Sequence, residues 1–504
     1  MTVYGASATR DRHGFFFGLT GVQVLLVGGA GFPVWLAMAV GEWLAVLVLV
    51  PAWALVSGLV CVPIRGWSAA QWIGVLGRHF LGRATGWTRW QSRAAAGEID
   101  DPGEADLPGV LASITIHDGP PLSGTTTRPA VIQNRATRTW AVTGRIGHRG
   151  IGMADEQERF RMGGGLAELL EGASASNQIH LIAVQVRTVP DDGTERAHWV
   201  RQHGRGDEPA LSGLIHAQID EAMQAAAVRT EAFVTVVARE ETIGKDAKRA
   251  GRGVLGRARV LYGLLGEVQS RLLGGIGCTS VHWLDSSELA TAIRTGFEPG
   301  DAPALADAAL HHARNEAIPP GVPVAAAGPT TASTALRSYS HGEWQSISTT
   351  ILLPRKGAVM GALAGALVPS EMGERRSLTV FYRPVSAQHA DRRTGRAEMS
   401  AAMGAEMRRK VGKLERAKER AVHQHLRETD EKLERGRSMV HASSVLSVTI
   451  PATWSGHDFA RRLDASVRLC GFTPLPLDGA HDAAFAAATI PLGTGLPRGR
   501  RGTK

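Results

Sequence analysis

The hydrophobic and polar positions divide the chain into a short apolar part and a long mixed part. Residues 15–64 are almost continuously apolar, and Glu42 is their only charged residue. One membrane span needs about 20 apolar residues, so this run is long enough for two. Glycines at positions 28, 29 and 31 would permit close packing of two helices. We expect residues 1–65 to form a two-helix transmembrane hairpin that divides at Gly41-Glu42-Trp43, with spans at residues 15–40 and 44–64.

Basic residues flank this apolar run on both sides. Arg10 and Arg12 precede it, the connection carries only an acid, and five arginines follow it: Arg65, Arg78, Arg83, Arg89 and Arg93. Cytoplasmic flanks of membrane spans are enriched in Lys and Arg. We therefore predict a protein of the cell membrane with its N-terminus and residues 66–504 on the cytoplasmic side. A signal peptide is not indicated, because a second apolar run follows the first directly.

Residues 66–106 predict an interfacial helix and then an acidic linker. Ser68 and Gln71 have the spacing of a capping box. Tryptophans and arginines alternate through this stretch, which is typical of a helix in the headgroup layer of anionic phospholipid. A helix packed on the soluble body would show the same pattern. The candidate membrane-interface residues are Trp43, Trp67, Trp72, Arg78, Arg83, Trp87, Arg89, Trp90 and Arg93.

The remaining sequence predicts an α+β body made of two related β-α-β-α units. Alternation of apolar and polar residues indicates strands, for example at 139–146 and 179–187. One order of elements occurs twice: strand, helix, glycine, short strand, aspartate, helix, as VTVV…GIGCTSVHWLD and as VTIP…RLCGFTPLPLD. We place the first unit at 107–297, an Ala/Pro/Gly-rich linker at 298–342, the second unit at 343–497 and a basic tail at 498–504.

A long charged helix is predicted at residues 391–437 of the second unit. Its apolar residues fall at helical spacing and form one stripe: Met407, Val411, Leu414, Val422, Leu426 and Leu433. The helix is basic early and acidic late. A helix packed on the body by its stripe explains this pattern, and so does a docking surface for a partner. The docking candidates are Arg408, Arg409, Lys410, Lys413 and Arg416. Contact with DNA is unsupported, because no DNA-binding motif accompanies the charge.

Composition narrows the class of protein but does not define its function. Hydrophobic residues at 44% and charged residues at 20% exclude a wholly disordered chain. The formal net charge of +9 is compatible with an anionic neighbour but does not define a function. The three cysteines, Cys61, Cys278 and Cys470, lie far apart, and no spacing suggests a disulfide framework or a thiol metal site.

Motifs that carry chemistry are not recognisable in the chain. It has no G-x-x-x-x-G-K-[ST], G-x-S-x-G or H-E-x-x-H pattern. Gly163-Gly164-Gly165 lacks the spacing of a dinucleotide-binding loop. His311-His312 and His423-x-His425 are better explained as surface histidines than as metal pairs. We expect no catalytic residue, no cofactor and no metal, and hence a protein that is not an enzyme.

Several segments resemble proteins of conjugative elements. Residues 443–493, SSVLSVTIPATWSGHDFARRLDASVRLCGFTPLPLDGAHDAAFAAATIPLG, follow the charged helix and resemble the end of the non-motor half of the conjugation (type IV secretion) ATPases. Residues 257–300 resemble an earlier part of the same half. The hairpin is similar to the small PrgI-type membrane component that works beside that ATPase. Taken together, the chain resembles a conjugative-element membrane protein of high-GC Gram-positive bacteria.

The resemblance implies a structural component of a secretion machine. In the ATPase family the motor domain, with its Walker lysine, would begin after about Pro491, whereas this sequence ends at Lys504. We therefore expect the translocation ATPase to be a separate polypeptide that docks on this chain at the inner membrane. Other membrane subunits of the channel and an oligomeric state are expected as well. The alternatives are an EccE-like component of a type VII secretion machine and a membrane-bound enzyme with an unrecognised site.

Overall fold

The computed structural model describes most of the chain in two units. The described residues are 21–61, 63–64, 67–151, 154–190, 199–200, 203, 209–226, 228–315, 317–352, 361–385 and 438–496. The helical unit contains the apolar helices up to Trp87, and the sheet unit begins at Thr88. The predicted helix at 391–437 lies outside the described residues, and with it the docking candidates Arg408, Arg409, Lys410, Lys413 and Arg416, the pair at 423 and 425, and the basic tail.

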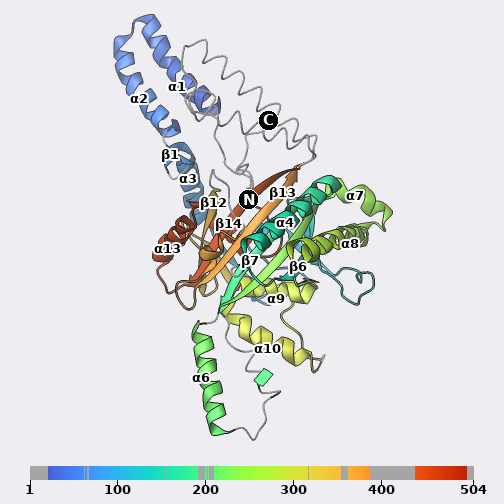
Figure 1. The fold of residues 1–504 in the computed structure, drawn as a ribbon. Coiled ribbons are helices and arrows are strands. Elements are labelled where there is room, and N and C mark those ends of the chain that lie inside the picture. The colour runs from blue at the N-terminus through green and yellow to red at the C-terminus, as the bar shows by residue number, and fades with distance from the viewer. Residues whose placement is uncertain are drawn as a thin grey trace. The chain divides into compact units, whose positions relative to one another are not determined.

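Two apolar helices dominate the helical unit (Figure 1). They are α1 (Gly21–Val40) and α2 (Trp43–Cys61). Gly41 ends α1 with a φ of +82°, a conformation that favours glycine. The Gly41 and Glu42 amides then donate to the Met38 and Ala37 carbonyls, at 3.3 and 3.0 Å, which is the Schellman pattern of a helix end. After α2 come the short strands β1 (Pro63–Ile64) and β2 (Trp67–Ser68), and then the helix α3 (Ala69–Thr85).

Trp53 joins the two apolar helices. Its Nε1 donates a hydrogen bond of 3.0 Å to the Val27 carbonyl of α1. Gly31 leaves the room for this ring, because a Cβ there would lie 3.0 Å from the Trp53 Nε1. Gly28 and Gly29 have no neighbouring atom within 4 Å of such a Cβ. Of the three glycines expected at the helix contact, Gly31 is the one that needs to be small.

The sheet unit is built on one antiparallel sheet of 13 described strands. Their order is β3-β10-β11-β12-β14-β13-β7-β8-β6-β5-β4, with β15 also paired to β12 and β9 to β6. The strands are β3 (Arg89–Gln91), β4 (Ile114–His117), β5 (Val131–Asn134), β6 (Thr139–Gly147), β7 (Ile179–Pro190), β8 (Val228–Arg239), β9 (Ser280–Trp283), β10 (Thr331–Thr334), β11 (Tyr339–His341), β12 (Trp344–Leu352), β13 (Arg375–Val385), β14 (Met439–Pro451) and β15 (Thr473–Pro476).

Helices connect these strands and cover the sheet (Figure 1). The longer helices are α4 (Glu156–Ser176), α6 (Ala210–Ala226), α7 (Glu240–Arg249), α8 (Gly253–Arg271), α9 (Ser286–Phe297), α10 (Ala302–His312), α13 (Gly456–Leu469) and α14 (His481–Thr489). The shorter ones are η1 (Gly109–Leu111), η2 (Leu272–Ile276), η3 (Pro299–Asp301), η4 (Val324–Ala326) and η5 (Ala364–Leu367). The protein is thus of the mixed α+β class, with a large antiparallel sheet.

Apart from β3 at one edge, the strand order of the two halves is the same when counted from the centre of the sheet. Starting from the centre, β7-β8-β6-β5-β4 on one side matches β13-β14-β12-β11-β10 on the other. The last strand of each half in chain order, β9 or β15, pairs with the third strand, β6 or β12. A helix then follows it, α9 in one half and α14 in the other. The two segments in which the sequence shows a recurring order, β8 to α9 and β14 to α14, therefore occupy equivalent places.

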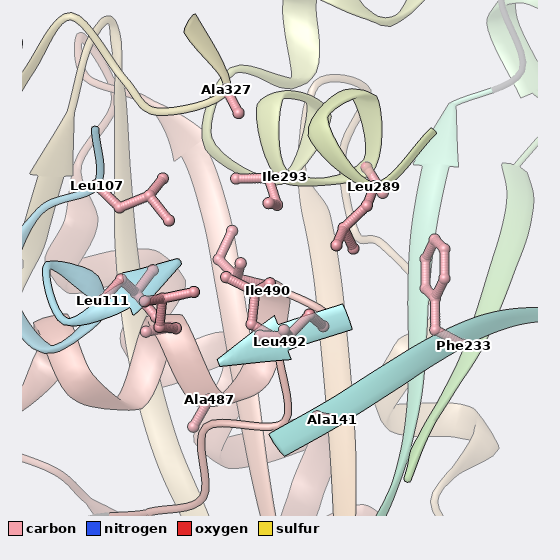
Figure 2. Close-up of a cluster of buried hydrophobic side chains, with 14 of the residues drawn as sticks. Leu107, Leu111, Ala141, Phe233, Leu289, Ile293, Ala327, Ala487, Ile490 and Leu492 are labelled. Atoms are coloured by element: carbon pink, nitrogen blue, oxygen red, sulfur yellow. The ribbon is translucent and has the colours of Figure 1, made fainter. Parts of the chain in front are cut away.

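Both faces of the sheet are covered by helices. One face carries a core shared by the two halves, to which α9 and α14 contribute Phe297 and Phe485. Figure 2 shows side chains of α9 and of residues 490–492 gathering in this core with Leu111 and Phe233. On the other face α4 and α8 cover the first half, and α13 with η5 covers the second. Alternation along β14 explains the division, since Leu446, Val448 and Ile450 face α13 while Val445 faces the shared core.

The structure corrects part of the predicted domain layout. Residues 298–342 are not a linker, because they contain α10, β10 and β11, and the last two extend the sheet. The two halves are joined in one sheet by the pairing of β7 with β13 rather than separated. The acidic stretch before residue 107 is also packed on the body, since buried Asp106 accepts hydrogen bonds from Ser92 and Ala94. Short strands and alanine-rich helices carry too little apolar patterning to be recognised in sequence.

Candidate functional site: the apolar helices and the polar clusters of the sheet

The α1–α2 pair exposes more large apolar side chains than it buries. Leu25, Trp43, Leu44 and Leu47 are 76%, 73%, 82% and 74% exposed. Among the described residues α2 is the one helix long and apolar enough to cross a membrane, with 19 residues and a mean hydropathy of 2.5. The apolar stretch Leu25–Val40 of α1 is shorter than that criterion. Such a surface is stable in water only when something apolar covers it.

The predicted interface residues fall into three groups. Trp43 is the first residue of α2, and Trp87, which follows α3, is 72% exposed. Arg83 is exposed in the last turn of α3, near Phe80 at 64% exposure. The backbone places Trp67 in β2 and Trp72 and Arg78 in α3, but their side chains lie outside the described set.

Arg89, Trp90 and Arg93 do not belong to an interfacial helix, which corrects the prediction for these three. Arg89 and Trp90 lie in β3, which pairs with β10 at the edge of the sheet, and Trp90 packs against the shared core. The Arg93 guanidinium lies 3.0 Å from the Glu104 carboxylate and 3.9 Å from that of Asp106. Alternating Trp and Arg residues are compatible both with one face of a helix and with an edge strand. At Arg89 and Trp90 the pairing with β10 shows that the chain forms an edge strand.

A buried arginine at the centre of the sheet holds α9. Arg187 of β7 is only 3% exposed. Its Nε donates to the Glu231 carboxylate of β8 at 2.8 Å, and its other nitrogens donate to the Ala292 carbonyl and the Thr295 hydroxyl, each at 2.8 Å. Burial alone would raise the pKa of Glu231, but the charge of Arg187 holds that pKa below its ordinary value. A cation at the end of α9 also complements the helix dipole.

A second buried ion pair holds η5 and α13 on the opposite face. Arg376 and Glu374 are each 2% exposed, and the Arg376 Nε lies 2.6 Å from the Glu374 carboxylate. The Arg376 guanidinium also donates to the Ala366 carbonyl at 2.9 Å and to the Ser466 hydroxyl of α13 at 3.0 Å. The Arg187–Glu231 and Arg376–Glu374 pairs each connect a strand to a helix. Stabilisation of the fold therefore explains both pairs without a ligand.

Ser346 and His341 form the arrangement that most resembles a catalytic pair. The Ser346 hydroxyl lies 2.8 Å from the His341 Nε2, and the His341 Nδ1 lies 2.6 Å from the Phe297 carbonyl. Both residues have no exposed surface, however. Burial lowers the pKa of His341 to about 3, so the ring is neutral and a weak base near neutral pH. Phe485 stacks on the ring at 4.4 Å, so the pair is part of the core.

Glu298 is a buried carboxyl beside the β11–β12 turn. It follows α9, is 7% exposed, and lies against Gly342, where a Cβ would meet its Oε1 at 1.8 Å. Burial raises the pKa of Glu298 from the ordinary 4.5 to about 7. Asp301 and Glu343 add to this increase, while the charge of Arg294 and the Glu343 amide oppose it. Arg294 is itself paired with Asp301 at 2.6 Å.

Metal-ligating side chains do not gather in the described part of the chain, where no group of three or more His, Cys, Asp or Glu residues could hold an ion. His311 lies 3.5 Å from the Asp307 carboxylate on α10, whereas the Nδ1 of His312 contacts the Ile318 carbonyl at 2.6 Å. The three cysteines are free thiols.

The helix α6, between β7 and β8, carries an exposed apolar surface that was not among the predicted sites. Its exposed apolar side chains are Leu211, Leu214, Ile215 and Ile219. Spacings of three and four residues put them on one face of the helix, and this signal is readable in the sequence.

Taken together, the fold and these surfaces define an α+β protein with an exposed apolar helix pair and a duplicated antiparallel sheet. No protein-family model and no curated protein matches the chain.

Proposed function

We propose that this protein is a membrane-anchored structural component of a conjugation or type IV-like secretion machine. In this proposal the α1–α2 hairpin spans the inner membrane twice, and the sheet unit lies on the cytoplasmic side. A separate translocation ATPase docks on that unit. The observation that carries the proposal is the exposed apolar surface of the hairpin, followed in the chain by a large α+β body.

Lipid is the covering that best fits the hairpin. Its exposed side chains are nearly all apolar and include Leu25, Leu44 and Leu47, each more than 70% exposed. The arginines that flank the hairpin in sequence favour a cytoplasmic position for both ends. Trp53 ties the two helices together, so the hairpin is supported as one inserted element rather than as two independent helices.

The ATPase partner is supported by the resemblance of the body. The two segments that resemble the non-motor half of conjugation ATPases are residues 257–300 and 443–493. They contain most of α8 with α9, and β14 with α13, β15 and α14, which are equivalent parts of the two halves. No Walker loop occurs in the sequence, so the proposal assigns nucleotide hydrolysis to the partner.

Membrane insertion is tested by changing exposed residues of α2. The double variant Val50→Arg/Leu55→Arg should move the protein from the membrane fraction to the supernatant or to degradation, because both exposed residues lie in the middle of α2, and Arg costs about 2.5–3.5 kcal/mol in the centre of a span. Leu469→Arg is the matched control, since Leu469 is 89% exposed on α13 of the sheet unit. Extraction of the unmodified protein by alkaline carbonate would refute membrane insertion.

Docking of an ATPase is tested by affinity purification from membranes. We expect a Walker-motif ATPase to copurify with the full chain and the purified chain alone to hydrolyse no ATP. Hydrolysis that persists through further purification would overturn the structural role. Copurification with small helical secreted proteins, without such an ATPase, would point to a type VII machine instead.

A further inference from the structure

The first half of the sheet carries a pair of helices where the second half has one. Between β8 and β9 the chain forms α7 and α8, followed by η2, whereas α13 is the helix between β14 and β15 (Figure 1). Residues 250–252 alone join α7 to α8. Both helices pack on the sheet, with Ile243 and Leu261 in the core of that face. One helix is enough at the equivalent place in the second half, so the fold alone does not explain the pair.

A short turn holds α7 against α8. The Arg252 amide donates to the Ala247 carbonyl at 3.0 Å. Gly256 permits the close approach, because a Cβ there would lie 2.1 Å from the Ala247 carbonyl oxygen. Arg252 itself has a φ of +59°, which strains a residue that carries a Cβ. Two helices joined by a short turn that contains glycine, here Gly251, are the connection found in helix-turn-helix proteins.

The exposed surface of this helix pair is basic. Residues 245–259 contain six Lys or Arg and one carboxylate, that of Asp246. The exposed basic residues are Lys245, Lys248, Arg249, Arg252 and Arg259. Helical spacing places those of α7 on one side of the helix, opposite the buried Ile243 and Ala247. The β5–β6 turn, whose Arg138 carbonyl accepts a hydrogen bond from the first amide of α7, adds exposed Arg135 and Arg138.

The carboxylates of this region already have partners. These are Arg257 for Glu240, Arg239 for Glu241 and Gln178 for Asp246. No ion pair involves Lys245, Lys248 or Arg252 in the described part of the chain. On the equivalent helix α13, by contrast, two of the three arginines are paired with carboxylates. The positive charge of the α7–α8 surface is therefore not compensated within the fold.

A basic surface with few apolar side chains fits the phosphates of nucleic acid better than lipid or protein. Leu255, at 42%, is the one exposed large apolar side chain of α7 and α8. Helices of the headgroup layer combine basic residues with several large apolar ones, as α3 does with Phe80 and Leu81. Protein interfaces are depleted in Lys and depend on aromatic anchors. Interfaces with DNA are strongly positive, and contacts to phosphate supply most of their non-specific affinity.

We propose that the α7–α8 pair binds duplex DNA through its phosphodiester backbone. Lys245, Lys248 and Arg252 supply the ionic contacts. The first turn of α8 has no side-chain cap, so its backbone amides are available to the same phosphates. Contacts of this kind carry no sequence information, and the binding is independent of sequence. This inference goes beyond the anchoring role and does not depend on it.

Fluorescence anisotropy of the full chain in detergent, with a short fluorescein-labelled DNA duplex, tests the proposal. Lys245→Gln/Lys248→Gln/Arg252→Gln should weaken binding at least about tenfold near 100 mM salt. Between about 50 and 200 mM salt, the slope of log K against log salt should fall in magnitude by about 2.7, since each phosphate contact contributes about 0.9. Unchanged affinity in the variant, or no measurable binding by the unmodified protein, overturns the proposal.

The equivalent helix supplies a control of equal charge. Arg461→Gln/Arg462→Gln/Arg468→Gln removes three exposed positive charges from α13, so both variants have the same net charge. The affinity of this control should stay within about twofold of the unmodified protein. An equal loss in both variants would mean attraction by net charge alone and would overturn the assignment to α7 and α8. Acetylation footprinting in nanodiscs adds the lipid outcome: protection of Lys245 and Lys248 by anionic lipid rather than by the duplex also overturns it.

Arg252→Gly separates binding from folding. Glycine adopts a φ of +59° without strain, so the melting temperature of this variant should not fall. Its affinity for the duplex near 100 mM salt should nevertheless fall by about threefold or more, because one phosphate contact is lost. A variant of unchanged stability that binds the duplex as tightly as the unmodified protein would contradict the inference.

Discussion

Glu298 gives the protein a stability that depends on pH around neutrality. Its carboxyl is buried against the β11–β12 turn, and burial raises its pKa to about 7 from the ordinary 4.5. A group whose pKa is higher in the folded state stabilises the fold in its protonated form. This contribution is fully present below the unfolded pKa of 4.5 and is lost as the pH rises to about 7 and beyond.

The size of the effect follows from the two pKa values. One pKa unit corresponds to about 1.4 kcal/mol, so the difference between 4.5 and about 7 gives a loss of about 3 kcal/mol between pH 4.5 and pH 8. The pKa of about 7 already includes the opposing charge of Arg294, whose guanidinium also pairs with Asp301 at 2.6 Å. Ionised Glu298 would also face Asp301 and Glu343, which carry the same sign.

Glu298→Gln is the variant that isolates this group, because an amide has nearly the same shape and does not titrate. Denaturant unfolding of the full chain in detergent, followed by tryptophan fluorescence, should be measured at pH 5, 6, 7 and 8. The unmodified protein should lose about 2–3 kcal/mol more than the variant across this range. Parallel pH profiles for the two proteins would refute the reasoning, and so would a Gln variant that is the less stable one at pH 8.

Three further predictions concern the packing of helices. Gly165→Ala should destabilise the sheet unit by about 1–3 kcal/mol through overpacking, because a Cβ at this position would lie 2.2 Å from backbone atoms of η2. Gly164→Ala is the control, since a Cβ there has no neighbouring atom within 4 Å. Thermal melting of the two variants measures the difference. Arg187→Met should cost about 3–5 kcal/mol because it removes the buried cation that pairs with the half-buried Glu231, and adding Glu231→Leu should recover part of the loss in the same assay. Trp53→Phe should weaken the contact between α1 and α2 by about 0.6–1 kcal/mol, because it removes the hydrogen bond to the Val27 carbonyl. Spin-label distances between the two helices would reveal this change.

Regular elements with strong periodicity were predictable from the sequence. The predicted strands at 139–146 and 179–187 correspond to β6 and β7, because alternating or continuous apolar residues are a direct signal of a strand buried on one or both faces. The helix after Asp285 was equally clear, and the structure shows its capping box with Glu288. The mixed α+β class follows from such segments.

Elements that depend on distant partners were not predictable. Glycine disfavours the interior of a helix, yet Gly163, Gly164 and Gly165 lie within α4, and the close approach of η2 requires a glycine at position 165. Arg89 and Trp90 resemble membrane-surface residues in the sequence, whereas the structure pairs both with β10 at the edge of the sheet. Glu298 carries no local signal for a raised pKa, since the turn that buries it lies more than 40 residues away in the chain.

The ladder between β7 and β13 has a consequence for the history of the chain. Either half alone would end in an open strand edge, and two identical halves joined along that edge would form a symmetric dimer of the same architecture. In a symmetric dimer both halves have the same sequence, so every substitution appears twice. When the two halves are parts of one chain, a residue can change in one half while its equivalent in the other half stays the same.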